Sequence, residues 1–284
     1  MKVLVVGASG MLGHVMMRVL SENSDWSVVG SIRHESLQEL FSKALRPYLI
    51  SGINVEEDSF IVKVLEETRP DVVINCAGLT KHKSEANDPV ASIVLNSLLP
   101  HRLAKFCKLF NVRLIHISTD CVFSGKKGNY VEDDLRDAKD LYGQSKALGE
   151  LIEPNALTLR ISTIGHELQG QYGLLNWFLS QKEQCNGYNR AIFSGLPTVI
   201  FARIIRDIVI PNAKLSGLYH VAAKPINKFD LLHLIAKTYD KEINIIADES
   251  LVIDRSLNAN RFQLETGFIA PDWPELIKSM HDYK

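Results

Sequence analysis

The sequence predicts a doubly wound α/β fold, in which helices cover both faces of a parallel sheet. Short apolar segments alternate with amphipathic ones through residues 1–165, and continuous apolar strands are typical of parallel sheets buried on both faces. A glycine-rich turn joins the first apolar segment to the first amphipathic one. Such a turn after the first strand indicates the Rossmann form of this fold.

The individual elements follow from the spacing of apolar residues. Strands are expected over residues 3–6, 27–31, 71–75, 113–118 and 157–161, and helices over 11–21, 36–45, 58–68, 89–110 and 142–152. Later helices are expected over residues 199–210, 228–239 and 273–280, and later strands over 217–221 and 243–246. We therefore expect a Rossmann domain at residues 1–165 and a smaller C-terminal α/β substrate-binding domain at 166–284. Part of 196–222 is expected to pack back on the first domain.

The composition argues against several classes of protein. The chain has 32 basic and 33 acidic residues, so it lacks the net charge that would favour nucleic acid or a membrane surface as a partner. No apolar stretch approaches the roughly 20 residues that span a bilayer, and the four cysteines form no CxxC pair. We expect a cytoplasmic protein with a small-molecule partner and no bound metal. The sequence leaves open whether it forms a homodimer.

The turn at residues 7–13 is a candidate cradle for a dinucleotide. Gly7 would permit the tight turn, Gly10 would let the backbone approach a pyrophosphate, and Gly13 would let helix and strand pack closely. Backbone amides at the start of the following helix would face the anion. The other residues assigned to cofactor binding in this turn are Ser9, Met11 and Leu12.

The end of the second predicted strand indicates which dinucleotide would bind. An acid that would hold the ribose hydroxyls of NAD is missing there before Glu35, whereas Ser31 and Arg33 are present. Because a guanidinium can pair with a 2′-phosphate, these two residues favour NADP. The alternative is that Arg33 is a solvated surface side chain.

Two residues four apart form the candidate catalytic pair. Tyr142 and Lys146 make a YxxxK motif at the start of a predicted helix, so their side chains lie on one face, about 6 Å apart along the axis. The lysine cation is expected to lower the tyrosine pKa from its reference value of about 10. Thr119, at the end of a predicted strand, could support the oxygen that gains charge or could simply cap backbone groups.

The chain resembles the extended short-chain dehydrogenase/reductases, and most closely the dTDP-4-dehydrorhamnose reductase family. The resemblance covers nearly the whole length and rests on GASGMLG at 7–13, NCAG at 75–78, STDCVFSG at 118–125, YGQSK at 142–146, LRIS at 159–162 and GLYHV at 217–221. It implies an NADPH-dependent oxidoreductase that reduces the C4 ketone of a nucleotide-activated 4-keto-6-deoxy sugar in deoxysugar or surface polysaccharide biosynthesis.

The resemblance also implies roles for particular residues. Thr119, Tyr142 and Lys146 would form the catalytic triad. Further cofactor contacts would come from Cys76, Ala77, Gly78 and Ile161, together with the pair Tyr142 and Lys146. Substrate contacts would come from Thr80, Lys81, Asp120, Cys121, Ser194 and Arg255.

Two alternative functions stay open at this point. Cys121 replaces the tyrosine that the family commonly has there, and with His166 it falls near the acid and base of epimerase-reductases that resemble GDP-L-fucose synthase. The residues at 30–34 also look similar to the regulatory subunit of methionine adenosyltransferase, which binds NADP as a partner protein. Dehydration is not expected, because Cys121 stands where the related dehydratases carry an acid.

Overall fold

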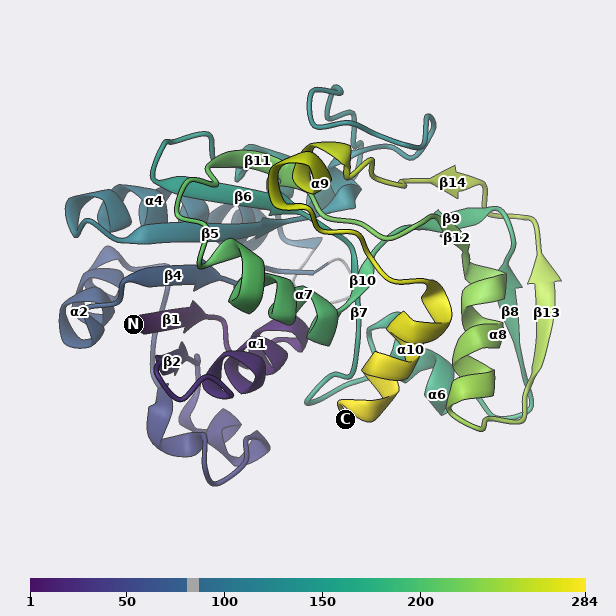
Figure 1. Ribbon diagram of the computed structural model, residues 1–284, viewed down its shortest axis with the longest axis horizontal. Helices are drawn as coiled ribbons and strands as arrows, with labels where there is room; N and C mark the ends of the chain where they lie inside the picture. The colour runs from purple at the N-terminus through teal and green to yellow at the C-terminus, as the bar shows by residue number, and fades with distance from the viewer. Residues whose placement is uncertain (81–86) are drawn as a thin grey trace. The chain divides into compact units, whose positions relative to one another are not determined.

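The computed structural model describes residues 1–80 and 87–284. The chain divides into two compact units, and Figure 1 shows its helices and strands. The first unit comprises residues 1–118, 140–159 and 202–218, and the second comprises 119–139, 160–201 and 219–284. Within the described residues, no helix combines the length and the apolar character needed to cross a membrane.

Within residues 1–80 and 87–284, the central sheet has seven strands in the order β11-β6-β5-β4-β1-β2-β3. Their bounds are β1 Lys2–Val6, β2 Ser27–Ser31, β3 Leu49–Ile50, β4 Val72–Asn75, β5 Arg113–Ser118, β6 Ala156–Arg160 and β11 Gly217–His220. Strand β1 pairs in parallel with both β2 and β4, so the chain order reverses at β1. Ligands of doubly wound folds bind at such a switch point, beyond the carboxyl ends of the strands.

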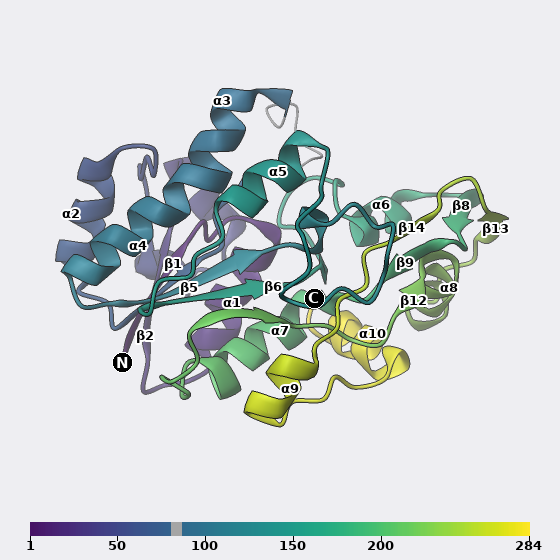
Figure 2. The same cartoon turned by 90° about the horizontal axis from the view of Figure 1, so that it is seen from above.

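Helices cover both faces of this sheet and confirm the predicted fold class. Helix α1 (Met11–Ser21) packs against β1 and β2, while α2 (Asp58–Thr68), α4 (Leu99–Leu109) and α5 (Leu141–Leu148) lie on the opposite side (Figure 2). A buried apolar cluster joins α2 and α4 to β1, β4 and β5. It includes Leu4, Val6, Ile61, Leu65, Val73, Leu103 and Leu114.

The predicted helix over residues 89–110 is divided into three parts. It consists of α3 (Pro89–Ser92), a π-helical segment η4 (Ile93–Leu98) and α4. Pro100 lacks an N–H group, so it cannot donate to the carbonyl of Asn96 as the α-helical pattern requires. This explains a widened turn at that point, and π-helical turns occur frequently at functional sites.

Two other predicted helices differ from the structure. The expected helix over residues 36–45 is wrong: only the 3₁₀ segment η1 (Glu35–Leu40) forms, followed by η2 (Arg46–Tyr48). None of the residues of η1 is buried, so no packing stabilises a longer helix. The helix expected over 199–210 forms as α7 (Thr198–Ile204) and the π-helical η6 (Ile205–Val209).

The second unit is built from small sheets and short helices. Its elements are η5 Asp120–Val122, β7 Thr163–Ile164, α6 Leu174–Ser180, β8 Gln184–Tyr188, β9 Ala191–Phe193, β10 Leu196–Pro197, β12 Ile226–Asn227, α8 Lys228–Thr238, β13 Asn244–Asp248, β14 Ile253–Asp254, α9 Asn260–Thr266 and α10 Trp273–Asp282. Strands β8 and β13 pair in parallel, and α8 packs against both of them (Figure 1).

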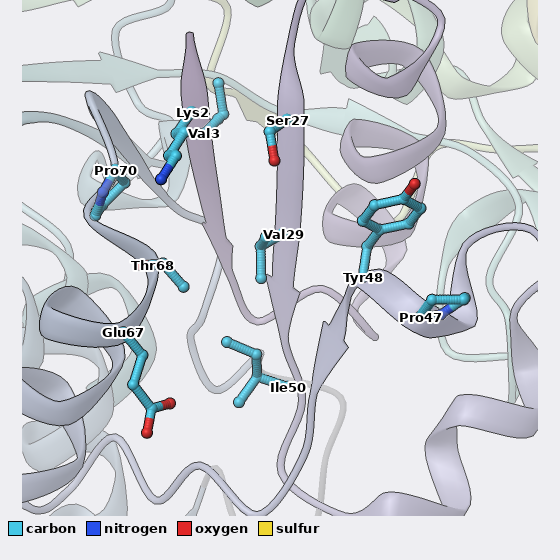
Figure 3. Close-up of a pocket in the computed structure, with 10 residues that line it drawn as sticks. All are labelled: Lys2, Val3, Ser27, Val29, Pro47, Tyr48, Ile50, Glu67, Thr68 and Pro70. Carbon is cyan, nitrogen blue, oxygen red and sulfur yellow. The ribbon is translucent and has the colours of Figure 1, made fainter.

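The first unit contains a pocket near the amino ends of β1 and β2 (Figure 3). Lys2, Ser27, Tyr48 and Glu67 are among the residues that line this pocket. Strand β1 runs from Lys2 toward the glycine-rich turn, so the pocket lies toward the edge of the sheet opposite that turn. None of the predicted site residues that the structure describes lines it.

Candidate active site

The glycine-rich turn lies at the carboxyl end of β1 and packs closely on its neighbours. Gly7 has a positive φ of 79°, and a β carbon there would lie 2.7 Å from the Cα of Ala77. A β carbon on Gly13 would overlap the carbonyl oxygen of Gly7. Both positions therefore require glycine for steric reasons, and the backbone after β1 touches the backbone after β4.

Gly10 differs from the other two glycines because the space around it is open. Its added β carbon would meet only the oxygen of Gly7, at 3.5 Å. Gly10 is the N-cap of α1 and provides no side-chain cap for the first amides of that helix. An exposed helix start that a β carbon would partly fill fits a bound pyrophosphate. The side chains of Ser9, Met11 and Leu12 around it are partly exposed.

The predicted NADP-selecting residues lie at the end of β2 in different environments. Ser31 is buried, and its hydroxyl oxygen accepts from the amide of Gly7 at 3.4 Å. Its carbonyl oxygen accepts from the amide of Ala8 at 3.0 Å. Ser31 therefore supports the glycine-rich turn, whereas Arg33 is exposed two residues beyond the strand.

The segment after β4 is ordered by the side chain of Asn75. The Oδ1 atom of Asn75 accepts from the amide of Ala77 at 3.1 Å, and its Nδ2 atom lies 3.1 Å from the Nδ1 atom of His116. Asn75 and His116 are both fully buried. The predicted cofactor residues Cys76, Ala77 and Gly78 thus follow β4 in a defined turn beside Gly7.

Asn96 is a functional candidate that the sequence interpretation did not identify. Its side chain accepts from the amide of Leu79 at 2.8 Å and donates to the carbonyl of Leu79 at 3.0 Å. It also donates to the hydroxyl of Ser145 at 3.1 Å, and that hydroxyl donates to the carbonyl of Tyr142 at 3.0 Å. Asn96 therefore joins the segment after β4 to the YxxxK helix. The sequence marks Asn96 only by its position four residues before Pro100, the proline that interrupts the helical hydrogen-bond pattern there.

Helix α5 places Lys146 at the carboxyl end of β5. The helix is capped by Asp140, whose side chain accepts from the amide of Gly143 at 2.9 Å. The ammonium of Lys146 is buried and donates to the carbonyl of Ile117 at 2.8 Å. Burial lowers the pKa of Lys146 to about 8, while the nearby Glu150 and Cys76 act in the opposite direction.

The other member of the candidate pair lies one turn earlier on the same helix. Tyr142 is partly exposed, whereas Lys146 is 6% exposed. A β carbon added to Gly78 would lie 4.0 Å from the Nζ atom of Lys146. The first unit thus gathers the glycine-rich turn, the segment after β4 and the end of α5 at one edge of the sheet.

Thr119 follows Ser118, the last residue of β5, and belongs to the second unit. Its hydroxyl donates to Asp120 at 3.0 Å and accepts from the amide of Cys121 at 3.1 Å. The hydroxyl therefore caps the 3₁₀ turn η5, which was the alternative to a catalytic role.

The second unit also brings together several predicted substrate contacts. The guanidinium of Arg255 donates to the carbonyl of Phe123 at 2.8 Å and lies 3.6 Å from the sulfur of Cys121. Ser194 is buried, and its hydroxyl oxygen accepts from the amide of Leu257 at 3.0 Å. Cys121 and Arg255 are thus direct neighbours, whereas the hydroxyl of Ser194 bonds to the backbone amide of Leu257.

The remaining predicted site residues are Ile161, Thr80 and Lys81, and His166 belongs to the alternative epimerase-reductase function. Ile161 is buried in the second unit, and Thr80 is exposed in the first. Lys81 lies outside the described residues. The Nε2 atom of His166 lies 2.9 Å from the hydroxyl of Tyr239.

The sheet order and the helices on both faces define a doubly wound α/β protein of the Rossmann class. The family model of the RmlD substrate binding domain matches residues 1–282. The chain therefore belongs to this family.

Three curated relatives are similar to this chain. The protein named "probable low-salt glycan biosynthesis reductase Agl14" of Haloferax volcanii is 34% identical over 169 residues, covering 58% of this chain and 54% of that protein. A dTDP-4-dehydrorhamnose reductase of Aggregatibacter actinomycetemcomitans is 22% identical over 307 residues, covering 99% of both. The methionine adenosyltransferase 2 subunit beta of Bos taurus is 30% identical over 172 residues, covering 59% of this chain and 48% of that protein. The chain thus aligns with about half the length of the first and third.

The fold is shared with a solved structure over its full length. A dTDP-4-dehydrorhamnose reductase of Bacillus anthracis, solved in complex with NADP, superposes with a TM-score of 0.81 at 20% sequence identity. The alignment covers 100% of this chain and 99% of that chain. This likeness confirms the fold class.

Proposed function

We propose that this chain is an NADPH-dependent oxidoreductase that reduces the C4 ketone of a nucleotide-activated 4-keto-6-deoxy sugar. The observation that carries the proposal is the position of Lys146 at the carboxyl end of β5, one helical turn after Tyr142, in a chain matched by the RmlD family over residues 1–282. The relatives named as reductases support the same class of reaction.

Most of the residues that would hold the dinucleotide belong to the first unit, while Ile161 belongs to the second. The start of α1 at Gly10 would receive the pyrophosphate, and the exposed Arg33 would pair with a 2′-phosphate. Cys76, Ala77 and Gly78 would lie along the bound cofactor after β4. When bound, NADPH supplies the hydride that reduces the carbonyl carbon.

The chain's own residues would handle the proton and the developing negative charge. The hydroxyl of Tyr142 would donate a proton to the ketone oxygen as that oxygen gains charge. The ammonium of Lys146 would stabilise the tyrosinate left behind, because opposite charges at short range favour the ionised form. We assign the hydroxyl of Thr119 as a second donor to the same oxygen, a role for which its single O–H must turn from Asp120 to the ketone.

We assign recognition of the sugar nucleotide to Thr80, Lys81, Asp120, Cys121, Ser194 and Arg255. A cytoplasmic location is part of this proposal. The four cysteines all lie in the described part of the chain and form no disulfide, which fits a reducing compartment.

The test is a panel of 4-keto-6-deoxy sugars carrying different nucleotides, followed by the loss of NADPH absorbance. Turnover with at least one sugar, and incorporation of a single hydride at C4, would support the proposal. Solvent deuterium at C3 or C5 of the product would indicate an epimerase-reductase instead. NADPH binding without turnover on any sugar would favour a regulatory subunit.

A further inference from the structure

Glu150 is a buried carboxylate that the proposed reaction does not use directly. It follows the end of α5 and is 7% exposed. Its Oε1 atom accepts from the hydroxyl of Ser118 at 2.7 Å, and Ser118 is the last residue of β5. A charged group at such a depth costs much free energy unless another charge or several hydrogen bonds compensate for it.

A side chain of opposite charge, Lys146, stands four residues earlier and interacts electrostatically with Glu150. The ammonium of Lys146 donates to Ile117, and the carboxylate of Glu150 accepts from Ser118. The two side chains thus form hydrogen bonds with two consecutive residues of β5, Ile117 and Ser118. Their electrostatic interaction favours the charged form of Lys146 and opposes the effect of burial.

Among the described residues, the thiol of Cys76 and the ring of His116 also interact electrostatically with Lys146. Burial raises the pKa of the Cys76 thiol to about 12. Burial lowers the pKa of His116, on β5, well below its usual value, and the charge of Lys146 contributes to that shift. Tyr142 lies one helical turn away on α5. Glu150 is therefore the carboxylate that acts on Lys146 among the described residues.

We propose that Glu150 is a positioning residue for the Tyr142–Lys146 pair. Its carboxylate, held by the Ser118 hydroxyl at the end of β5, keeps the buried Lys146 side chain in place and in its charged form. The inference rests on the proposed reductase function, in which a charged Lys146 supports proton donation by Tyr142. The substitution Glu150→Gln isolates the charge, because glutamine keeps the shape and an oxygen acceptor for Ser118.

The primary experiment titrates Lys146 directly in the full chain without cofactor. Lysine labelled with ¹³C at Cε is followed by NMR, and Lys146→Arg identifies the resonance by its loss. We expect a midpoint near pH 8 in the parent and a midpoint lower by about one pH unit or more in Glu150→Gln. Ser118→Ala retains the carboxylate and should shift the midpoint by less than half as much. An unchanged midpoint in Glu150→Gln would overturn the proposal.

A second measurement covers the case in which Glu150→Gln folds poorly. Removing one partner of a buried ion pair leaves the other uncompensated, whereas removing both restores much of the stability. The double variant Lys146→Met with Glu150→Gln should therefore recover at least half of the Tm lost by Glu150→Gln. No recovery would mean that the two charges are not coupled, and the inference would be wrong.

The outcomes separate this inference from the proposed function. If Glu150→Gln leaves the Lys146 midpoint unchanged while the parent reduces a keto sugar, the role of Glu150 is refuted and the reductase function stands. If the midpoint moves but the parent reduces none of the sugars, the charge coupling is supported and the reductase function fails.

Discussion

The ammonium of Lys146 lies 2.8 Å from the carbonyl oxygen of Ile117. This contact ties α5 to the carboxyl end of β5, next to the turn that follows β4. Because Lys146 is buried there, its pKa falls to about 8. The charge that the proposed mechanism requires of Lys146 would therefore be lost within an experimentally accessible pH range.

The first prediction concerns the pH dependence of reduction. A lysine with a lowered pKa is charged below that pKa and loses its proton as the pH rises through it. We expect kcat/KM for the keto sugar to be constant below about pH 7.5 and to fall about tenfold per pH unit above pH 8. A rate that stays constant up to pH 10 would contradict a role for charged Lys146.

The second prediction concerns the proton donor. Tyr142→Phe removes the hydroxyl and should lower kcat by at least about 10²-fold, within the range typical of general acid catalysis. NADPH affinity, measured by fluorescence titration, should stay within a few fold. Tyr172→Phe is the matched control, because Tyr172 is 56% exposed and should leave kcat unchanged. Full activity of Tyr142→Phe would refute the assignment.

The third prediction contrasts two glycines of the same turn. Gly13→Ala places a methyl group on the carbonyl of Gly7 and should lower the Tm markedly, because backbone atoms must move. Gly10→Ala meets its neighbour at 3.5 Å and should leave the Tm within a few degrees. It should nevertheless weaken NADPH binding by about tenfold or more, because the methyl group partly fills the proposed pyrophosphate position. Unchanged NADPH affinity in Gly10→Ala would place the phosphates elsewhere.

The fourth prediction tests cofactor selection at the end of β2. Arg33→Ala should weaken NADPH binding by about tenfold or more and NADH binding much less, because only NADPH carries the 2′-phosphate. Lys43→Ala, another exposed cation, serves as the control for a general loss of positive charge. An equal loss of both cofactors in Arg33→Ala would remove the case for 2′-phosphate recognition.

The fifth prediction concerns the link made by Asn96. Asn96→Ala removes three hydrogen bonds at a fully buried position and should cost about 2–4 kcal/mol of unfolding free energy. It should also lower kcat more than it raises the Kd for NADPH, because the support of α5 through Ser145 is lost. Urea unfolding and steady-state kinetics measure the two effects. A variant with the stability and kcat of the parent would show that the link is dispensable.

Much of the first unit could be predicted because its signals are local. The helices over residues 11–21 and 58–68 and the strands over 27–31 and 113–118 form with the predicted bounds, because the apolar pattern that predicts each of them lies within the element itself. The expected helix over 36–45 is wrong, because none of the residues of η1 is buried and Phe41 alone, just after it, reaches the core. In the second unit, strands of two or three residues such as β9 and β14 are too short for periodicity to reveal.

The candidate site residues also divide into those that the sequence alone could identify and those that only the folded structure reveals. The sequence alone identifies two of the patterns, because each lies within one turn or one helix. They are the three glycines in seven residues and the tyrosine four residues before a lysine. The partners of Asn96 and Glu150 are 17 to 49 residues away along the chain. A contact between distant residues exists only after the sheet and helices have packed, so folding in three dimensions alone brought Glu150 to Ser118 and Lys146 to Ile117.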